Sequence, residues 1–268
     1  MTSVADAFDL AALDAELDGT RFAGHLHFFP SIASTNNYAM EEAAEGAPDG
    51  SVYFADEQTA GRGRGAHAWS SPPGSGLYVS ILLRPRIAPA DILWLSLAAG
   101  LAAQDAVRSV AGIEADLRWP NDLLLGPKKF CGILTELNAE VTRVRHAVVG
   151  IGINVHQAHF PNELNAVATS LFVETGRDFS RQALLLALLE ALDREVRALS
   201  ETSALPLVAQ GIRERLEASS SWIRGKRVRV DENGGFIGTT AGLDARGFLQ
   251  VQTADGIRTV LSGGVREN

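Results

Sequence analysis

Residues 118–137 confine the chain to a sharp corner followed by two short apolar runs. The proline of the Trp-Pro-Asn-Asp sequence fixes its own φ and keeps Trp119 out of the helical region, and the Asn and Asp side chains can bond to nearby backbone. The apolar runs at 123–125 and 129–134 are separated by a Gly-Pro turn signal. The pattern predicts a β-hairpin whose second strand starts at Lys129 and lies in the interior.

Two residues of this hairpin are candidates for a functional site. Lys129 stands between the turn and the apolar strand, and its plain alternative is a solvated turn lysine. Gly132 lies inside the strand, where a glycine usually marks a bulge or the close approach of another backbone or a ligand.

The composition indicates a globular protein with a full core. The chain has 268 residues, 46% hydrophobic and 21% charged, which suits one large domain or one with a small appendage. Its net charge of −8 argues against general nucleic-acid binding. A single cysteine, Cys131, excludes a disulfide framework and fits a reducing compartment. The first residues lack a signal-peptide pattern and no run is apolar enough to span a bilayer, so we expect a cytoplasmic protein.

A polar cluster, residues 34–37 (Ser-Thr-Asn-Asn), follows an expected strand at residues 25–29. Ser34 or Thr35 is a good N-cap for a helix that begins here, and that cap is the plain alternative. Hydroxyl and amide groups at a helix N-terminus can also bind a polar ligand. The cluster is therefore a second candidate site.

A third candidate is the segment 61–65, Gly-Arg-Gly-Arg-Gly, which an expected strand at residues 51–60 runs into. It fits the glycine pattern of dinucleotide-binding proteins, but residues 67–73 contain two prolines and cannot start the required helix. We interpret it as a mobile loop whose arginines, Arg62 and Arg64, can wrap a phosphate or a carboxylate. A plain flexible loop is one alternative; an RNA-binding arginine-glycine segment is another, disfavoured by the acidic chain.

Residues 145–155 predict a strand in which Gly150 and Gly152 share one face. Two missing side chains on one face would leave a slot for a flat ligand, with Asn154 at its end. The alternative is close packing of a helix on the sheet.

The remaining pattern alternates helices with strands, and predicts a mixed, largely antiparallel sheet with helices, an α+β fold. From Trp222 onward, short strands at turn-rich spacing indicate a small β-barrel-like domain docked on the main body. We therefore divide the chain into residues 1–221 and 222–268. Helices are expected at 8–17, from 34 or 35, and at 91–111, 180–199 and 205–216.

Taken in order along the chain, these features resemble the biotin protein ligases. Each motif alone is weak, but the ordered set is specific and spans the chain from about residue 8 to the C-terminus. The ending, residues 262–265, is similar to the close of the family's small C-terminal domain. The motifs are Ser34-Thr35-Asn36, Gln58 with Gly61-Arg62-Gly63-Arg64-Gly65, Trp119-Pro120-Asn121-Asp122, Lys129 with Gly132-Ile133-Leu134, and Gly150-Ile151-Gly152-Ile153-Asn154.

The resemblance implies a catalytic domain like that of class II aminoacyl-tRNA synthetases and an SH3-like C-terminal β-barrel. It implies a ligase that activates biotin with ATP and Mg²⁺ to biotinyl-5'-AMP. The biotin would then pass to a specific lysine of the biotin carboxyl carrier protein of acetyl-CoA carboxylase or of a related biotin-dependent carboxylase. A homodimer is compatible with this resemblance.

The resemblance also implies roles for individual residues, with Lys129 and Arg64 as the catalytic ones. Biotin contacts are implied for Ser34, Thr35, Asn36, Gln58, Gly61, Arg62, Gly63, Arg64, Lys129, Gly132, Leu134 and Gly150. ATP contacts are implied for Arg62, Arg64, Trp69, Asn121, Lys129 and Asn154. No metal ligand is assigned.

Two positions depart from the family pattern. Residues 65–68 are Gly-Ala-His-Ala where the family often carries further basic residues, which leaves the tightness of adenylate retention open. Arg118 stands where a lysine is more usual. Too few residues precede the first strand for the N-terminal helix-turn-helix of bifunctional members, so we expect a monofunctional ligase that binds no nucleic acid.

Two rival functions remain at this point. A lipoate or octanoyl ligase or transferase shares the catalytic fold, although the glycine-arginine loop and the Trp-Pro-Asn-Asp corner favour biotin. A non-catalytic biotin sensor or repressor is the other, and Lys129 argues against it.

Overall fold

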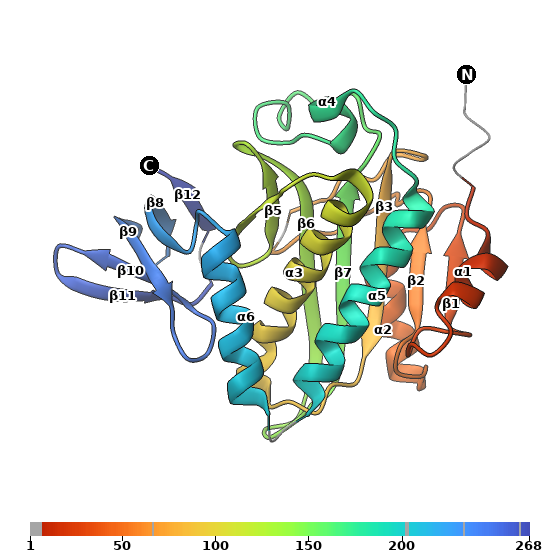
Figure 1. Ribbon diagram of the computed structural model, residues 1–268, viewed down its shortest axis with the longest axis horizontal. Helices are drawn as coiled ribbons and strands as arrows, with labels where there is room; N and C mark the ends of the chain where they lie inside the picture. Colours follow the sequence, from red (N-terminus) through yellow and green to blue (C-terminus); the bar gives the residue numbers. More distant parts are fainter. Residues whose placement is uncertain (1–6, 66, 202–203, 233, 263) are drawn as a thin grey trace.

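The computed structural model describes residues 7–65, 67–201, 204–232, 234–262 and 264–268. Its larger part is built on one sheet with the strand order β1-β2-β3-β7-β6-β5-β4 (Figure 1). β1 and β2 are parallel and every other neighbouring pair is antiparallel, which confirms the predicted mixed sheet. The strands are β1 (Leu26–Phe29), β2 (Val52–Ala55), β3 (Gly76–Leu83), β4 (Asp116–Arg118), β5 (Asp122–Leu125), β6 (Lys128–Ala139) and β7 (Val144–Asn154).

The helices cover the two faces of this sheet unequally (Figure 1). Three long helices, α3, α5 and α6, lie on one face, and α2 lies on the other. The helices are α1 (Leu10–Glu16), α2 (Thr35–Glu45), α3 (Ile92–Ala111), α4 (Leu171–Thr175), α5 (Arg181–Ser200) and α6 (Leu205–Ser219). All five predicted helices are present, with ends shifted by a few residues, and α4 was not predicted.

The main core lies between the sheet and the three long helices. Alternate residues of the central strands, such as Ile81, Ile133 and Ile151, are buried in it because strand side chains point to opposite faces in turn. The helical stretch Pro89–Ala111 is long and apolar enough, by length and composition alone, to cross a membrane, so the expectation that no run of the chain is apolar enough was wrong. Most of it is buried against the sheet and α5, as expected of the core helix of a globular domain.

The opposite face of the sheet is only partly covered. Ala39 and Ala43 of α2 pack there against Val148 and its neighbours in a second, smaller cluster. Farther along β7 on the same face stand Gly150 and Gly152, which bring no side chains. This stretch of the face is left hollow, and the predicted site residues gather around it.

The predicted hairpin is confirmed as β5 and β6, joined by a turn in which Gly126 has φ +56°. β6 begins one residue earlier than expected, at Lys128. The strand expected at residues 51–60 ends at Ala55, and Gln58 instead forms an isolated bridge with Ser71. That segment turns away from the sheet toward the glycine-arginine loop.

The last part of the chain forms a separate antiparallel sheet with the order β11-β10-β9-β8-β12 (Figure 1). It contacts the main body where Trp119 Nε1 donates a hydrogen bond to the backbone oxygen of Gly247, at 2.9 Å. The predicted division between residues 221 and 222 falls between the end of α6 and the start of β8, and stays a prediction. The strands are β8 (Arg224–Asp231), β9 (Phe236–Leu243), β10 (Leu249–Thr253), β11 (Gly256–Val260) and β12 (Gly264–Glu267).

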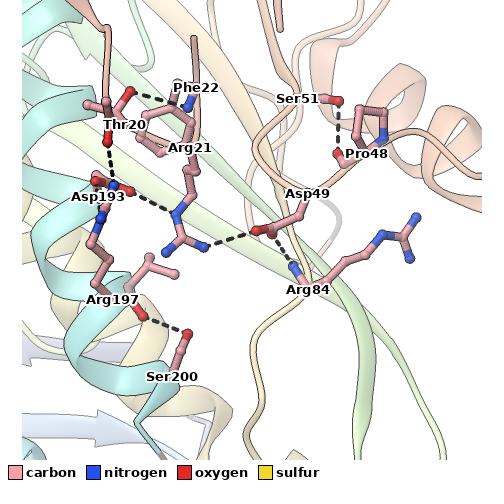
Figure 2. Close-up of polar contacts among 12 residues, drawn as sticks. Thr20, Arg21, Phe22, Pro48, Asp49, Ser51, Arg84, Asp193, Arg197 and Ser200 are labelled. Carbon is pink, nitrogen blue, oxygen red and sulfur yellow. Dashed lines mark hydrogen bonds and ion pairs between the residues drawn. The ribbon is translucent and has the colours of Figure 1, made fainter. Parts of the chain in front are cut away.

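A network of ion pairs fastens the start of the chain to α5 (Figure 2). Arg21 Nε is 2.8 Å from Asp193 Oδ1, and Arg21 NH1 is 3.1 Å from Asp49 Oδ2. Asp193 also receives Arg197 Nε at 2.6 Å, and Asp49 accepts a hydrogen bond from the backbone nitrogen of Arg84. The network joins the loop before β1, the turn before β2, the end of β3 and the middle of α5.

Arg21→Ala is expected to lower the free energy of unfolding by about 2–3 kcal/mol, because Asp193 is then left in a buried position with one partner fewer. Urea denaturation measures this effect. The control is Arg108→Ala, which removes exposed pairs with Asp105 and Glu114 and should cost less than about 1 kcal/mol. Equal losses from the two variants would mean that the Arg21 network contributes nothing beyond a surface pair.

Candidate active site

The polar cluster at residues 34–37 forms the start of α2, as the predicted helix cap requires. Ser34 is the N-cap, and its Oγ accepts a hydrogen bond from the backbone nitrogen of Asn37 at 3.4 Å. Thr35 and Asn36 are nevertheless buried with their side chains toward the hollow face of the sheet. The cluster thus both caps the helix and supplies polar groups to a cavity.

One cavity is lined by every predicted site residue except Gly61 and Asn154. Its free volume is about 40 Å³, room for only a few water molecules. The chain's own side chains fill the rest, so a larger ligand requires some of them to move. The cavity is lined by Ser34, Thr35, Asn36, Gln58, Arg62, Gly63, Arg64, Trp69, Asn121, Lys129, Gly132, Leu134 and Gly150, together with Val79, Ser80, Ile133, Ile151 and Gly152.

Gly61 and Asn154 have different surroundings. A Cβ at Gly61 would lie 2.5 Å from the backbone oxygen of Trp69, so this glycine permits a close backbone approach within the loop. The Asn154 side chain donates to the backbone oxygen of Thr169 at 2.9 Å and lines a neighbouring cavity of about 200 Å³. Trp69 and Lys129 line both cavities, so the two adjoin.

The glycine slot is present, and side chains of the chain itself lie in it. Gly132 and Gly152 are register partners, and the indole of Trp69 lies over both, where any Cβ would collide with it. A Cβ at Gly150 would lie 2.5 Å from Asn36 Oδ1. The Trp69 Nε1 atom is buried there without a hydrogen-bond partner in the described part of the chain.

A chain of hydrogen bonds runs along one end of the cavity. Gln58 Oε1 accepts from the backbone nitrogen and the hydroxyl of Thr35, at 2.9 and 3.0 Å. The Thr35 hydroxyl lies 2.8 Å from Ser80 Oγ, which is 3.1 Å from Asn36 Oδ1. Ser80 was not predicted; its signal is its position on β3 opposite Gly150.

The two loop arginines point to opposite sides of the cavity. Arg62 forms a bidentate ion pair with Glu136 of β6, with both N–O distances at 2.9 Å. Arg64 donates to Asn121 Oδ1 and to the backbone oxygen of Ser262, each at 3.1 Å. Of the segments discussed above, Ala66 in this loop and Gly263 in the ending lie outside the described residues.

Lys129 forms an ion pair with Asp122, which argues against the alternative that it is a solvated turn lysine. Its Nζ is 2.5 Å from Asp122 Oδ1, and Asp122 Oδ2 is 2.7 Å from Arg118 NH2. Burial would raise the pKa of Asp122, but the two cations outweigh burial and hold that pKa below its usual value. Two cations thus share one ionised carboxylate and leave a net positive charge beside the cavity. Lys129 Nζ lies over the Trp69 ring, 5.1 Å from the ring centroid.

Cys131 lies on the other face of β6, in the main core. Burial raises the pKa of its thiol to about 12, so the thiol stays protonated and is not a nucleophile for the site. In the part of the chain that the structure describes, no three His, Cys, Asp or Glu side chains come together as a metal site.

Comparison with known proteins identifies the family. Residues 28–154 match the model of the biotin/lipoate A/B protein ligase family, and residues 224–265 match the biotin protein ligase C-terminal domain. The bifunctional ligase/repressor BirA of Bacillus spizizenii is 36% identical over 90% of this chain and 73% of its own length. The chain belongs to the biotin protein ligase family.

Further relatives of this ligase support the same assignment. The biotin–[acetyl-CoA-carboxylase] ligase of Mycobacterium tuberculosis is 36% identical over 85% of this chain and 82% of its own. The biotin protein ligase of Aquifex aeolicus, solved in complex with biotin and ATP, is 31% identical with a TM-score of 0.79, covering 91% of this chain and 100% of that chain. The predicted α+β fold, a catalytic mixed sheet followed by a small β domain, is thereby confirmed.

Proposed function

We propose that this ligase condenses biotin with ATP to biotinyl-5'-AMP and then transfers the biotinyl group to a lysine of a biotin carboxyl carrier protein. The observation that carries the proposal is the cavity itself. A neutral polar chain around Thr35 and Asn36 occupies one end, and the Lys129–Asp122–Arg118 cluster stands at the other. Biotin likewise has a neutral, polar ureido head and a carboxylate tail.

The first step joins two anions, and the cations of the site suit it. A carboxylate oxygen of biotin attacks the α-phosphorus of ATP, a new oxygen–phosphorus bond forms, and the bond to pyrophosphate breaks. Lys129 stabilises the charge that develops there, because β6 holds its backbone rigidly while Asp122 fixes its ammonium group. Arg64 adds positive charge from the loop, whereas the charge of Arg62 is matched by Glu136 at the head end of the cavity.

The same proposal extends to the other residues of the cavity. Ser34, Thr35, Asn36 and Gln58 hold the ureido head, and Gly132, Leu134 and Gly150 wall the slot. The neighbouring cavity of Asn154, which shares Trp69 and Lys129 with the first, is suited to the nucleotide. Asn121 joins the loop to β6 by accepting from Arg64 while donating to the backbone oxygen of Ile133.

The second step needs the adenylate to survive until the carrier arrives. Acyl adenylates hydrolyse in water, so a loop that lies over the site protects the intermediate. The loop is tied by Arg62 to β6 and by Arg64 to the small domain, which supports that role. The neutral amine of the carrier lysine then attacks the carbonyl carbon, and AMP leaves.

Mg²⁺ enters this proposal with ATP. Magnesium is usually held by substrate phosphates, water and one or two carboxylates rather than by a protein cage. Asp122, the carboxylate beside the cavity, is already shared by Lys129 and Arg118, so the ion would be held by phosphate oxygens and water. The ion would supply further stabilisation of phosphate charge.

Incubation with biotin, ATP, Mg²⁺ and a carrier domain should add one biotin mass to the carrier, as measured by mass spectrometry. Replacing biotin by lipoate or octanoate should add none, which separates this function from that of the related lipoate enzymes. A chain that binds biotin but releases no pyrophosphate from ATP would instead be a sensor.

We also propose that this chain works in the cytoplasm and binds no operator DNA. The single buried thiol suits a reducing compartment, and the net charge of −8 disfavours contact with phosphate backbones. A gel-shift titration with biotin-operon promoter DNA at physiological salt should give no sequence-specific complex below micromolar protein. The sequence resemblance is compatible with a homodimer. Sedimentation analysis with and without biotin and ATP measures the mass of the particle and so tests this.

A further inference from the structure

Glu136 of β6 meets two residues of the proposed biotin site at once. Its Oε2 accepts from Asn36 Nδ2 at 2.5 Å, and its two oxygens receive Arg62. It lies on the cavity face of β6, opposite Val148, and its side chain is 27% exposed. It is not among the residues that line the cavity, so any effect it has on a ligand acts through its partners.

The contact with Glu136 decides which way the Asn36 amide points. An ionised carboxylate accepts hydrogen bonds and donates none, so the NH₂ group of Asn36 must face Glu136. Its oxygen is then directed to Ser80 and to the space over Gly150. Without the carboxylate, the two orientations of the amide would be far closer in energy.

The hydroxyl groups beside this amide are one proton short. Thr35 and Ser80 carry one hydroxyl proton each, yet three contacts could use them: Thr35 to Gln58, Thr35 to Ser80, and Ser80 to Asn36. Thr35 donates to Gln58 and Ser80 donates to Asn36 Oδ1, whose second lone pair still has no hydroxyl donor. A ureido N–H of biotin can supply that donor.

We propose that Glu136 is a positioning residue that orients the Asn36 amide so that its oxygen faces the ureido head of biotin. This rests on the proposed function and goes further by naming the group that sets the polarity of the head pocket. A flipped amide would present an N–H to the ureido N–H, and the ligand would lose an acceptor. Glu136 also keeps Arg62 beside this end, where the guanidinium donates to Asn37 Oδ1 at 2.6 Å as well.

The test is calorimetric binding of biotin to the full chain without ATP. Glu136→Ala should raise the Kd for biotin by about 10- to 100-fold, the usual effect of losing a hydrogen bond to a charged group. Glu136→Gln keeps the size and one acceptor, and should recover part of that loss. The matched control is Glu140→Gln, just past β6, which removes an exposed pair with Arg143 and Arg145 and should leave the Kd unchanged.

A double-mutant cycle separates positioning from general damage. If Glu136 acts through Asn36, the pair Asn36→Ala with Glu136→Ala binds biotin no more weakly than Asn36→Ala alone. The KM for biotin should rise with Glu136→Ala more than the KM for ATP does, because the contact lies at the head end. If Glu136→Ala does not fold, Glu136→Gln is used in the same cycle.

Additive losses in the cycle, or a Kd for Glu136→Ala like that of Glu140→Gln, would overturn the inference while leaving the proposed function intact. Absence of biotin binding by the unmodified chain would overturn the proposed function, and this inference with it.

Discussion

Replacing Lys129 by alanine is expected to lower the rate of adenylate formation by about two to three orders of magnitude, because the substitution removes a preorganised charge at the reacting centre. Lys129 leaves a buried strand and is held by Asp122 at 2.5 Å, so its ammonium group needs no reorganisation when charge develops on the α-phosphate. Single-turnover release of pyrophosphate from ATP and biotin measures the step.

The neighbouring lysine provides the control for this substitution. Lys128 also belongs to β6 but does not line the cavity, so Lys128→Ala should leave the rate nearly unchanged. Thermal unfolding must be compared as well, because Lys129→Ala leaves Asp122 with Arg118 as its remaining cation. Pyrophosphate release by Lys129→Ala at close to the unmodified rate would show that the charge is not needed there.

Arg64→Gly is expected to have a different and equally visible effect. Arg64 holds the loop by hydrogen bonds to Asn121 and to the backbone oxygen of Ser262, so its loss should free the loop and release the adenylate. Formation of the adenylate should continue, and lysines of bystander proteins should become biotinylated. Blotting an added protein without a carrier sequence for biotin measures the release.

Arg177→Gly, at a loop arginine that stacks on Phe179 away from the site, is the control and should label no bystander. If Arg64→Gly stops pyrophosphate release as completely as Lys129→Ala and labels nothing, the two residues do not divide the work in this way. Residues 65–68 carry fewer basic groups than is common in the family, so release of the adenylate by Arg64→Gly must be compared with release by the unmodified chain.

The parts of the fold that could be predicted are those with a local signal. The corner at Trp119 and the turn at Gly126 predict the hairpin because proline and glycine restrict or free the backbone at single positions. The cap at Ser34 works in the same way, within one turn of helix. Short elements such as β4 and α4 were not predicted, because three to five residues carry too little periodicity.

The residues that were missed in the site depend on register. Ser80 and Glu136 look like ordinary strand residues, and their roles arise because β3 and β6 flank β7 in one particular alignment. Asp122 was interpreted as a turn residue, although its carboxylate lies between two cations. The indole of Trp69 in the glycine slot likewise depends on how the loop folds back, which no local pattern specifies.

We expect the small domain to affect the lifetime of the adenylate. It is joined to the main body by the Trp119–Gly247 hydrogen bond and to the loop by the Arg64–Ser262 hydrogen bond. Linkage is reciprocal, so whatever free energy the closed loop gains from the docked domain, the domain gains from the closed loop. A bound adenylate should therefore slow amide exchange in a sheet that carries out none of the chemistry. Conversely, a change at Gly247 that loosens this docking should shorten the lifetime of the adenylate from a distance.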